Sequence, residues 1–213
     1  MNQRSLKLSS KKSNEVFLRV FPGHFATNHS HINFYIDMTT LKSRKSEAQG
    51  AANYIAQRIA HNTIVDTILC LDGTEVIGAF LADALQNAGF YSVNEHKTIY
   101  VVSPECDSSG RIIFRDNNKF MVEKKNVLIL QSNVTTGLHM ERVMECIKYY
   151  GGVVSGITAL FSNLKEHGGY QIASLFDIDD LPEYRSYPYN QCPMCAAKKK
   201  ITAMVNSYGY SEI

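Results

Sequence analysis

The sequence lacks any apolar run long enough to cross a membrane. None of its 213 residues belongs to a stretch that approaches the ~20 consecutive apolar residues of a transmembrane helix. The segment MNQRSLKLSSKKSNE at its start is polar and has no apolar signal-peptide core. We therefore expect a cytoplasmic protein with no membrane partner.

The sequence also lacks a strong charge of either sign. Its formal net charge is +2, and its longest basic runs are Lys124-Lys125 and Lys198-Lys199-Lys200. Nucleic-acid-binding proteins normally carry a basic stripe and a higher charge, so we expect no nucleic-acid partner. A hydrophobic content of 45% and a charged content of 20% are typical of a globular domain that can form a proper core.

The five cysteines are too few, and odd in number, for a disulfide framework, which favours free thiols in a reducing compartment. Two of them form the motif CPMC, and Cys192 and Cys195 are half of the four ligands that a structural zinc needs. The missing pair could come from Cys106, Cys146, a histidine or a symmetry mate. The alternatives are a redox-active pair beside the Lys198 to Lys200 run, or two packed thiols in a turn.

Strand-like and helical patterns alternate through the middle of the chain. Buried-type strands are predicted at residues 67–71, 98–102, 127–130, 153–162 and 168–176, and helices at about 46–60, 79–89 and 138–152. Parallel strands need helical crossovers and are buried on both faces. The alternation therefore predicts an α/β fold, with a mostly parallel central sheet and helices on both faces.

The two ends of the sequence differ from this middle part. Residues 1–14 are rich in Ser and Lys and predict a flexible arm, and residues 15–21 predict a strand that Pro22-Gly23 stops. From Pro182 onward the sequence is rich in Tyr and small polar residues, which predicts an extension docked on the main domain. We therefore divide the chain into an arm (1–14), an α/β domain (15–181) and a C-terminal extension (182–213).

Three polar loops follow predicted strands, at residues 72–78, 103–125 and 131–139. In open parallel sheets, ligands bind beyond the carboxyl ends of the strands. In the third loop, Thr135-Thr136-Gly137 leads into a helix, whose free N–H groups at its start can hold a phosphate. Thr and Gly are also ordinary capping and turn residues, so the tripeptide alone does not decide between the two roles.

The order of these parts resembles the type I phosphoribosyltransferases, and most closely the orotate phosphoribosyltransferases. The family motif is an apolar run, two acidic residues, two apolar residues and Thr-Thr-Gly. Here VLIL (127–130) matches the run, Gln131 and Ser132 occupy the acidic positions, and Thr-Thr-Gly is present. HINFYID (31–37) is similar to an early His-Ser-Asn-Tyr-Tyr-Ile-Asp-type segment, and CPMC to a Cys-Pro-x-Cys segment in a branch of orotate enzymes.

This resemblance implies the family fold with a small hood, and transfer of ribose 5-phosphate from phosphoribosyl pyrophosphate (PRPP) to a nitrogenous base with Mg²⁺. It also implies a homodimer. Three basic residues of the 103–125 loop would close over the pyrophosphate as catalytic groups, namely Arg111, Arg115 and Lys119. The residues expected to bind PRPP or a nucleotide are Asp72, Gly73, Thr74, Glu75, Ser132, Asn133, Thr135, Thr136, Gly137, Leu138 and His139.

The departures from the family motif bear on turnover. The acidic pair contacts the ribose hydroxyls and supports the pyrophosphate and metal, and each charge-assisted hydrogen bond contributes about 1.5 to 3 kcal/mol. With Gln131 and Ser132 in these positions, the rate should fall roughly a hundredfold to ten-thousandfold. Asp72 and Glu75 are the nearest replacement carboxylates. We predict a phosphoribosyltransferase of altered or weak activity, or alternatively a non-catalytic protein that binds PRPP or a nucleotide.

Overall fold

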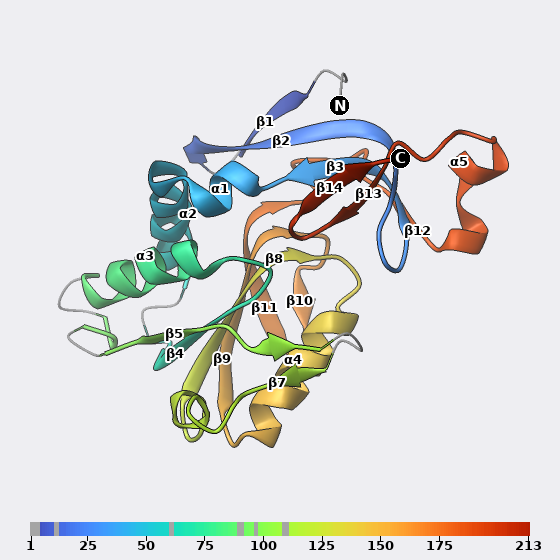
Figure 1. The fold of residues 1–213 in the computed structure, drawn as a ribbon. Coiled ribbons are helices and arrows are strands. Elements are labelled where there is room, and N and C mark those ends of the chain that lie inside the picture. The colour runs from blue at the N-terminus through green and yellow to red at the C-terminus, as the bar shows by residue number, and fades with distance from the viewer. Residues whose placement is uncertain (1–4, 11–12, 60–61, 89–91, 96–97, 108–110) are drawn as a thin grey trace.

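A six-stranded, mostly parallel sheet forms the centre of the computed structural model, which describes residues 5–10, 13–59, 62–88, 92–95, 98–107 and 111–213 (Figure 1). Only the β10–β11 pair is antiparallel. The predicted α/β architecture is therefore confirmed. The order across the sheet is β10 (Glu166–His167), β11 (Tyr170–Asp177), β9 (Val153–Ser162), β8 (Asn126–Val134), β4 (Thr67–Cys70) and β5 (Tyr100–Val102).

Helices cover both faces of this sheet (Figure 1). The helices α2 (Lys45–Arg58) and α3 (Glu75–Gln86) pack on one face, and α4 (Leu138–Tyr149) packs on the other. Successive side chains of β8 point to opposite faces of the sheet. Leu128 and Leu130 pack in the core on the α2 and α3 side, and Ile129 packs in the core under α4. An apolar run without polar interruption is what such a doubly covered strand requires.

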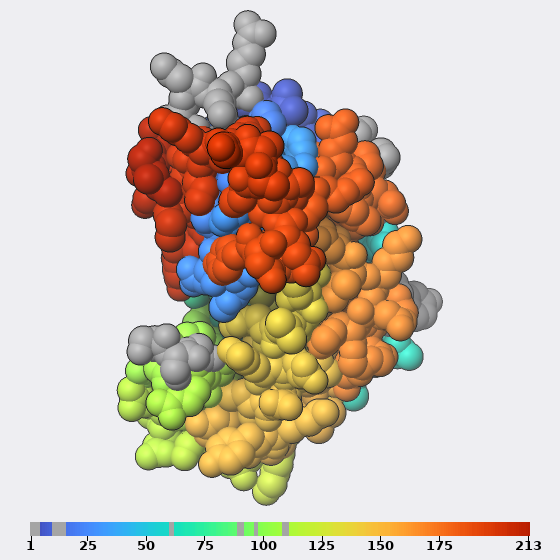
Figure 2. Space-filling model, turned by 90° about the vertical axis from the view of Figure 1, so that its right-hand side faces the viewer, coloured from blue at the N-terminus to red at the C-terminus, as the bar shows by residue number. Residues whose placement is uncertain are grey.

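A second sheet, which we call the hood, lies across the carboxyl ends of the central strands (Figure 1). The short helix α1 (Thr39–Ser43) connects it to α2. Figure 2 shows the red and orange C-terminal extension lying over the blue N-terminal strands. The hood strands are β12 (Ser186–Tyr187), β3 (His31–Asp37), β2 (Ser13–Ala26), β13 (Ala203–Asn206) and β14 (Gly209–Glu212) in that order, with β1 (Leu6–Ser10) paired to β2.

Strand β2 is longer than its sequence predicts. It continues through Pro22-Gly23 to Ala26, and its pairing with β3 shifts register between Pro22 and Phe25. A bulge of this kind tolerates proline, so the predicted stop at Pro22-Gly23 is wrong. In the segment predicted as a flexible arm, Leu6–Ser10 form β1 because they find a pairing partner in β2.

Among the described residues, no helix combines the length and the apolar character that crossing a membrane would take.

The packing of α3 on β4 depends on a glycine. A Cβ added at Gly78 would collide with the buried Cys70 Sγ and would lie 3.1 Å from Val101 Cγ1. We expect Gly78→Ala to lower the free energy of unfolding by about 1–3 kcal/mol through overpacking. Urea unfolding at fixed pH measures this change.

Gly50→Ala on α2 is the matched control, because the nearest atom to its added Cβ is Val16 Cγ2 at 3.5 Å. That contact is ordinary, so the higher helix propensity of alanine should raise stability by about 0.5–1 kcal/mol. Equal effects of the two substitutions would contradict the proposed close approach at Gly78.

Candidate functional site

Two loops meet at one edge of the central sheet because β4 and β8 are parallel neighbours. Cys70 pairs with Leu130, so the loops that follow both strands begin side by side. Thr74 is fully buried between them, and its hydroxyl lies 2.9 Å from the carbonyl oxygen of Leu71 and 3.1 Å from that of Leu130. Thr74 therefore holds the two loops together, and its hydroxyl faces protein atoms.

The loop after β4 brings a carboxylate beside Ser132 of β8. Asp72 and Gly73 both have left-handed backbone conformations, with φ of 59° and 77°. The Ser132 hydroxyl donates a hydrogen bond to Asp72 Oδ2 at 3.1 Å. Glu75 Oε1 instead accepts a hydrogen bond from Ser103 Oγ at 2.6 Å. Asp72 thus lies beside the uncharged Ser132 of β8, whereas Glu75 is directed toward Ser103 in the loop after β5.

Lys42 is a basic residue of this site that sequence reasoning missed. Its Nζ donates hydrogen bonds to the carbonyl oxygens of Asp72 at 2.7 Å and of Ser207 at 2.6 Å. Burial lowers the pKa of this ammonium group, while the nearby carboxylates, Asp72 first among them, oppose the shift. The side chain therefore connects the hood to the loop. The sequence feature that could have indicated a role for Lys42 is its position shortly after HINFYID (31–37).

The turn after β8 has the geometry of an anion-binding helix start. Gly137 has φ of 79° and is the N-cap residue of α4, and no side chain among the described residues caps this end. A Cβ at Gly137 would lie 2.6 Å from His167 Nδ1, so the imidazole of His167 packs against the turn. Thr136 and Leu138 are exposed beside it, and Thr135 is half-buried. His167, on the short strand β10, had no recognisable sequence signal.

Three buried polar atoms near this turn have no hydrogen-bond partner among the described residues. They are Gln131 Oε1, Asn133 Oδ1 and His139 Nε2. Side-chain alternation along β8 places Gln131 and Asn133 on the same face as Ile129, under α4, and Ser132 on the opposite face near Asp72. Buried polar groups are normally hydrogen-bonded, so ordered water or a polar ligand that reached these atoms would supply the partners that they lack.

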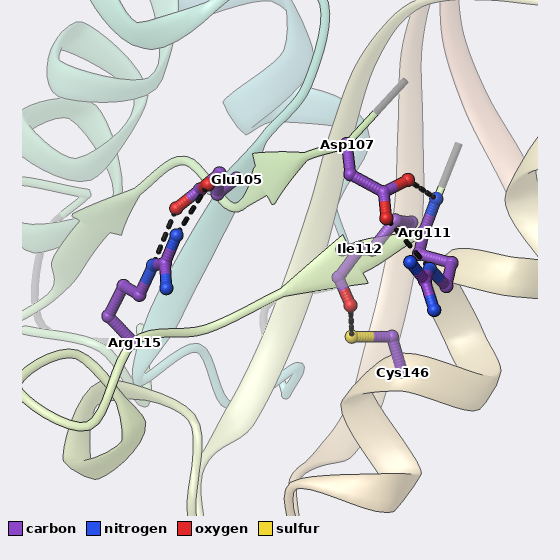
Figure 3. Close-up of polar contacts among 6 residues, drawn as sticks. All are labelled: Glu105, Asp107, Arg111, Ile112, Arg115 and Cys146. Atoms are coloured by element: carbon purple, nitrogen blue, oxygen red, sulfur yellow. Dashed lines mark hydrogen bonds and ion pairs between the residues drawn. The ribbon is translucent and has the colours of Figure 1, made fainter. Parts of the chain in front are cut away.

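The predicted basic loop contains a short hairpin, formed by β6 (Glu105–Cys106) and β7 (Ile112–Ile113), whose expected centre, Ser108 to Gly110, lies outside the described residues. Arg111 Nε lies 2.7 Å from Asp107 Oδ2, and Arg115 forms a bidentate pair with Glu105 at 2.6 and 2.7 Å (Figure 3).

These contacts have two consequences. The Arg115 guanidinium lowers the pKa of the Glu105 carboxyl through its hydrogen bonds and its charge. The hairpin is also held against α4, because the Cys146 thiol contacts the Ile112 carbonyl oxygen at 3.4 Å (Figure 3).

Lys119 lies elsewhere. It belongs to the 3-10 turn η1 (Lys119–Met121) and forms an ion pair with Asp116 at 2.6 Å. The hydroxyl of Thr67, the first residue of β4, donates to the carbonyl of Met121. This turn is therefore at the amino end of the sheet, and the structure does not bring Lys119 to the loops at the carboxyl edge.

A second cluster lies in the hood and contains both cysteines of the CPMC motif. After the turn η2 (Tyr189–Gln191), Cys192 is the N-cap of the short helix α5 (Pro193–Ala196) and Cys195 lies within that helix. Both meet His24 of β2 and His31 of β3. One ligand atom from each of the four residues lies within 4.8 Å of the others, and together they could hold a metal ion. Burial and the neighbouring His24 lower the pKa of His31, which favours the neutral imidazole.

The sequence therefore predicted two members of this cluster, Cys192 and Cys195. It also gave a histidine as one candidate for the two missing ligands. Cys146 instead packs against the hairpin and is not a member, nor is Cys106. His24 was missed because β2 was expected to end before it.

The close contact at Gly137 generates a prediction. Gly137→Ala should lower stability both through its left-handed backbone, about 1–2 kcal/mol, and by displacing His167, about 1–3 kcal/mol more. Gly169→Ala is the matched control, since φ there is 85° and an added Cβ meets nothing within 4 Å. Denaturant unfolding of both variants would measure the difference. Equal losses would show that His167 does not press on the turn.

Comparison with known proteins yields fold relatives only. No protein-family model and no curated protein matches the sequence. Among solved structures, the orotate phosphoribosyltransferase of Aeropyrum pernix aligns with a TM-score of 0.56 and 19% identity over 77% of this chain and 90% of its own. The Mycobacterium tuberculosis orotate phosphoribosyltransferase in complex with PRPP gives 0.51 and 14%, over 69% and 82%.

The UMP synthase of Leishmania donovani gives a TM-score of 0.57 and 16% identity over 76% of this chain, but the match spans only 34% of that protein. At these identities the likeness concerns the fold. The aligned part covers 77% of this chain and 90% of the Aeropyrum pernix structure, so the likeness extends over most of the fold. The chain therefore has the fold of the type I phosphoribosyltransferases, with orotate phosphoribosyltransferases among its structural neighbours.

Proposed function

We propose that this chain binds PRPP or a related nucleotide at the carboxyl edge of its parallel sheet, and that it transfers ribose 5-phosphate to a nitrogenous base at a low rate. The observation that carries the proposal is the set of partnerless buried atoms of Gln131, Asn133 and His139 around the Gly137 turn. A phosphorylated sugar supplies the hydroxyl donors and phosphate acceptors that these atoms need.

The turn at residues 135–139 would hold the 5-phosphate. The first N–H groups of α4 point toward it, and the helix dipole favours an anion at this end. His139 and His167 border the same turn and can each donate a hydrogen bond to phosphate. Ser132 and Asn133 lie one step back along β8, where a ribose joined to that phosphate would follow.

The loop at residues 72–75 would hold the pyrophosphate. Two consecutive left-handed residues turn successive backbone N–H groups to one side, which is the geometry of an anion nest. Its carboxylates, Asp72 and Glu75, are hard oxygen donors of the kind that Mg²⁺ prefers. When bound, Mg²⁺ would neutralise charge on the leaving pyrophosphate. Lys42 holds this loop through the Asp72 carbonyl.

Arg111 and Arg115 would act from the hairpin. Each forms an ion pair with an acidic residue of the same hairpin, and these pairs are exposed to water and salt, which screen them. Exchanging such a partner for a pyrophosphate oxygen is therefore energetically accessible. A homodimer belongs to the proposal, because in the family this loop acts across a dimer. So does a cytoplasmic location, which fits the free thiols.

A second candidate is a protein that binds PRPP or a nucleotide without turnover. It is favoured by the identity and burial of Gln131 and Ser132, which leave no carboxylate on β8 at the positions where the family has two. The Asp72 carboxylate, which accepts from Ser132, approaches from the neighbouring loop.

Calorimetry with PRPP, in the presence and absence of Mg²⁺, tests the proposal together with an orotate turnover assay. We expect Mg²⁺-dependent binding, and turnover slower than that of an enzyme with the acidic pair by roughly a hundredfold to ten-thousandfold. Binding without any turnover, also with other nitrogenous bases, would favour the second candidate. If neither PRPP nor nucleotides bind, both candidates are wrong.

The replacement of the acidic pair by the 72–75 loop can be tested separately. In the double variant Asp72→Asn, Glu75→Gln, the Mg²⁺-dependent part of PRPP binding should weaken about tenfold or more, because charge-assisted contacts contribute about 1.5–3 kcal/mol each. Asp83→Asn, an exposed change on α3, is the control and should bind like the unchanged protein. Unchanged Mg²⁺ dependence in the double variant would exclude this role.

A further inference from the structure

We propose that His24, His31, Cys192 and Cys195 bind one zinc ion that fastens the C-terminal extension to strands β2 and β3 of the hood. The inference concerns a site in the hood whose residues are not those proposed above to bind PRPP, and it does not depend on PRPP binding. It completes the pair of cysteines with two histidines that come from the N-terminal part of the chain.

Four of the six distances between ligand atoms are close to those of a tetrahedral site. Zinc bonds of about 2.0–2.1 Å to nitrogen and about 2.3 Å to sulfur place neighbouring ligand atoms about 3.3–3.8 Å apart. Here His24 Nε2 lies 3.1 Å from His31 Nδ1, 3.5 Å from Cys192 Sγ and 3.6 Å from Cys195 Sγ. Cys195 Sγ lies 3.2 Å from His31 Nδ1. The two remaining distances, from Cys192 Sγ to His31 and to Cys195, are at most 4.8 Å, so a shift of up to about an ångström at Cys192 would complete the coordination shell.

The backbone around the cluster orients its ligands. The other ring nitrogen of His24, Nδ1, lies 2.8 Å from the carbonyl oxygen of Lys199. A carbonyl can only accept, so Nδ1 carries the proton and the lone pair of Nε2 faces the cluster. Metal-bound histidines are typically oriented by this kind of outer hydrogen bond. The Cys192 and Cys195 carbonyls accept from the N–H groups of Ala196 and Lys198, which fixes the turn that carries both thiols.

The surroundings suit a structural ion rather than a catalytic one. His24, His31 and Cys192 are buried, and Cys195 alone reaches the surface. Without a metal, two imidazoles and two thiols would converge in a largely buried place, where weak thiol donors satisfy the ring nitrogens poorly. Two thiolates with two imidazoles in a tetrahedron select zinc among the common divalent metals.

The ion would join distant parts of the chain. His24 and Cys192 are separated by 168 positions, and the segment between β12 and β13 that contains α5 pairs with no strand of the hood. A crosslink across so long a loop removes conformational freedom from the unfolded chain, which is how it stabilises. Because β13 and β14 follow directly, the same link also sets the position of Ser207, to which Lys42 donates.

Metal analysis of the full chain, purified without added metal and dialysed, tests the proposal. We expect about one zinc per chain in the unchanged protein, and at least about tenfold less in Cys195→Ser, which loses one of four ligands. Cys106→Ser is the matched control: Cys106 is also exposed and free but lies in the β6–β7 hairpin, so this variant should keep its zinc.

A second measurement covers the case in which Cys195→Ser fails to fold. Titration of the unchanged, metal-stripped protein with Co²⁺ should give the intense visible bands of a tetrahedral site and a sulfur-to-cobalt charge-transfer band, with saturation near one ion per chain. Less than about a tenth of an equivalent of zinc with no tetrahedral Co²⁺ spectrum would overturn the proposal, as would equal zinc loss in both variants. So would a Cys192–Cys195 disulfide in freshly prepared, alkylated protein, which would make the pair redox-active.

Discussion

The parallel pairing of β4 with β8 is the constraint on which the candidate site depends. It brings Asp72 and Ser132, 60 positions apart in the chain, to one edge of the sheet and within hydrogen-bonding distance. The pairing is stable because both strands are apolar on both faces and helices cover each face. After the apolar run at residues 127–130, β8 continues with Gln131, Ser132 and Asn133 at the carboxyl edge of the sheet, beside the loop that contains Asp72.

At this edge of the sheet the carboxylate beside β8 belongs to a neighbouring loop and not to the strand itself. The negative group comes from a left-handed loop residue, Asp72, and the strand contributes an uncharged hydroxyl donor. A loop carboxylate is less rigidly held than one on a central strand. Lys42 compensates in part, because its ammonium group ties the Asp72 carbonyl to the hood. The position of the charge thus depends on contacts between two sheets.

Sequence patterns predict the strands of the central sheet well, but they predict poorly which side chains come together at the two candidate sites. The strand at 153–162 agrees in both bounds, because a long apolar run is the direct consequence of burial on two faces. Helix α3 begins at Glu75 instead of Ala79, since the polar start of a helix looks like a turn. Lys42, His167 and His24 could not be assigned, because each acts through a partner that is distant in the chain and that only the folded hood or sheet edge brings near.

The hood has a consequence for synthesis, because it combines strands from opposite parts of the chain: β13 pairs in parallel with β2, and β12 pairs antiparallel with β3. During translation the segments for the central sheet emerge from the ribosome long before β12 and β13 do. Until those strands arrive, β2 and β3 present unpaired edges, which are the parts of a nascent chain most prone to associate with other chains. Completion of the hood is therefore the step at which this protein would benefit most from a chaperone.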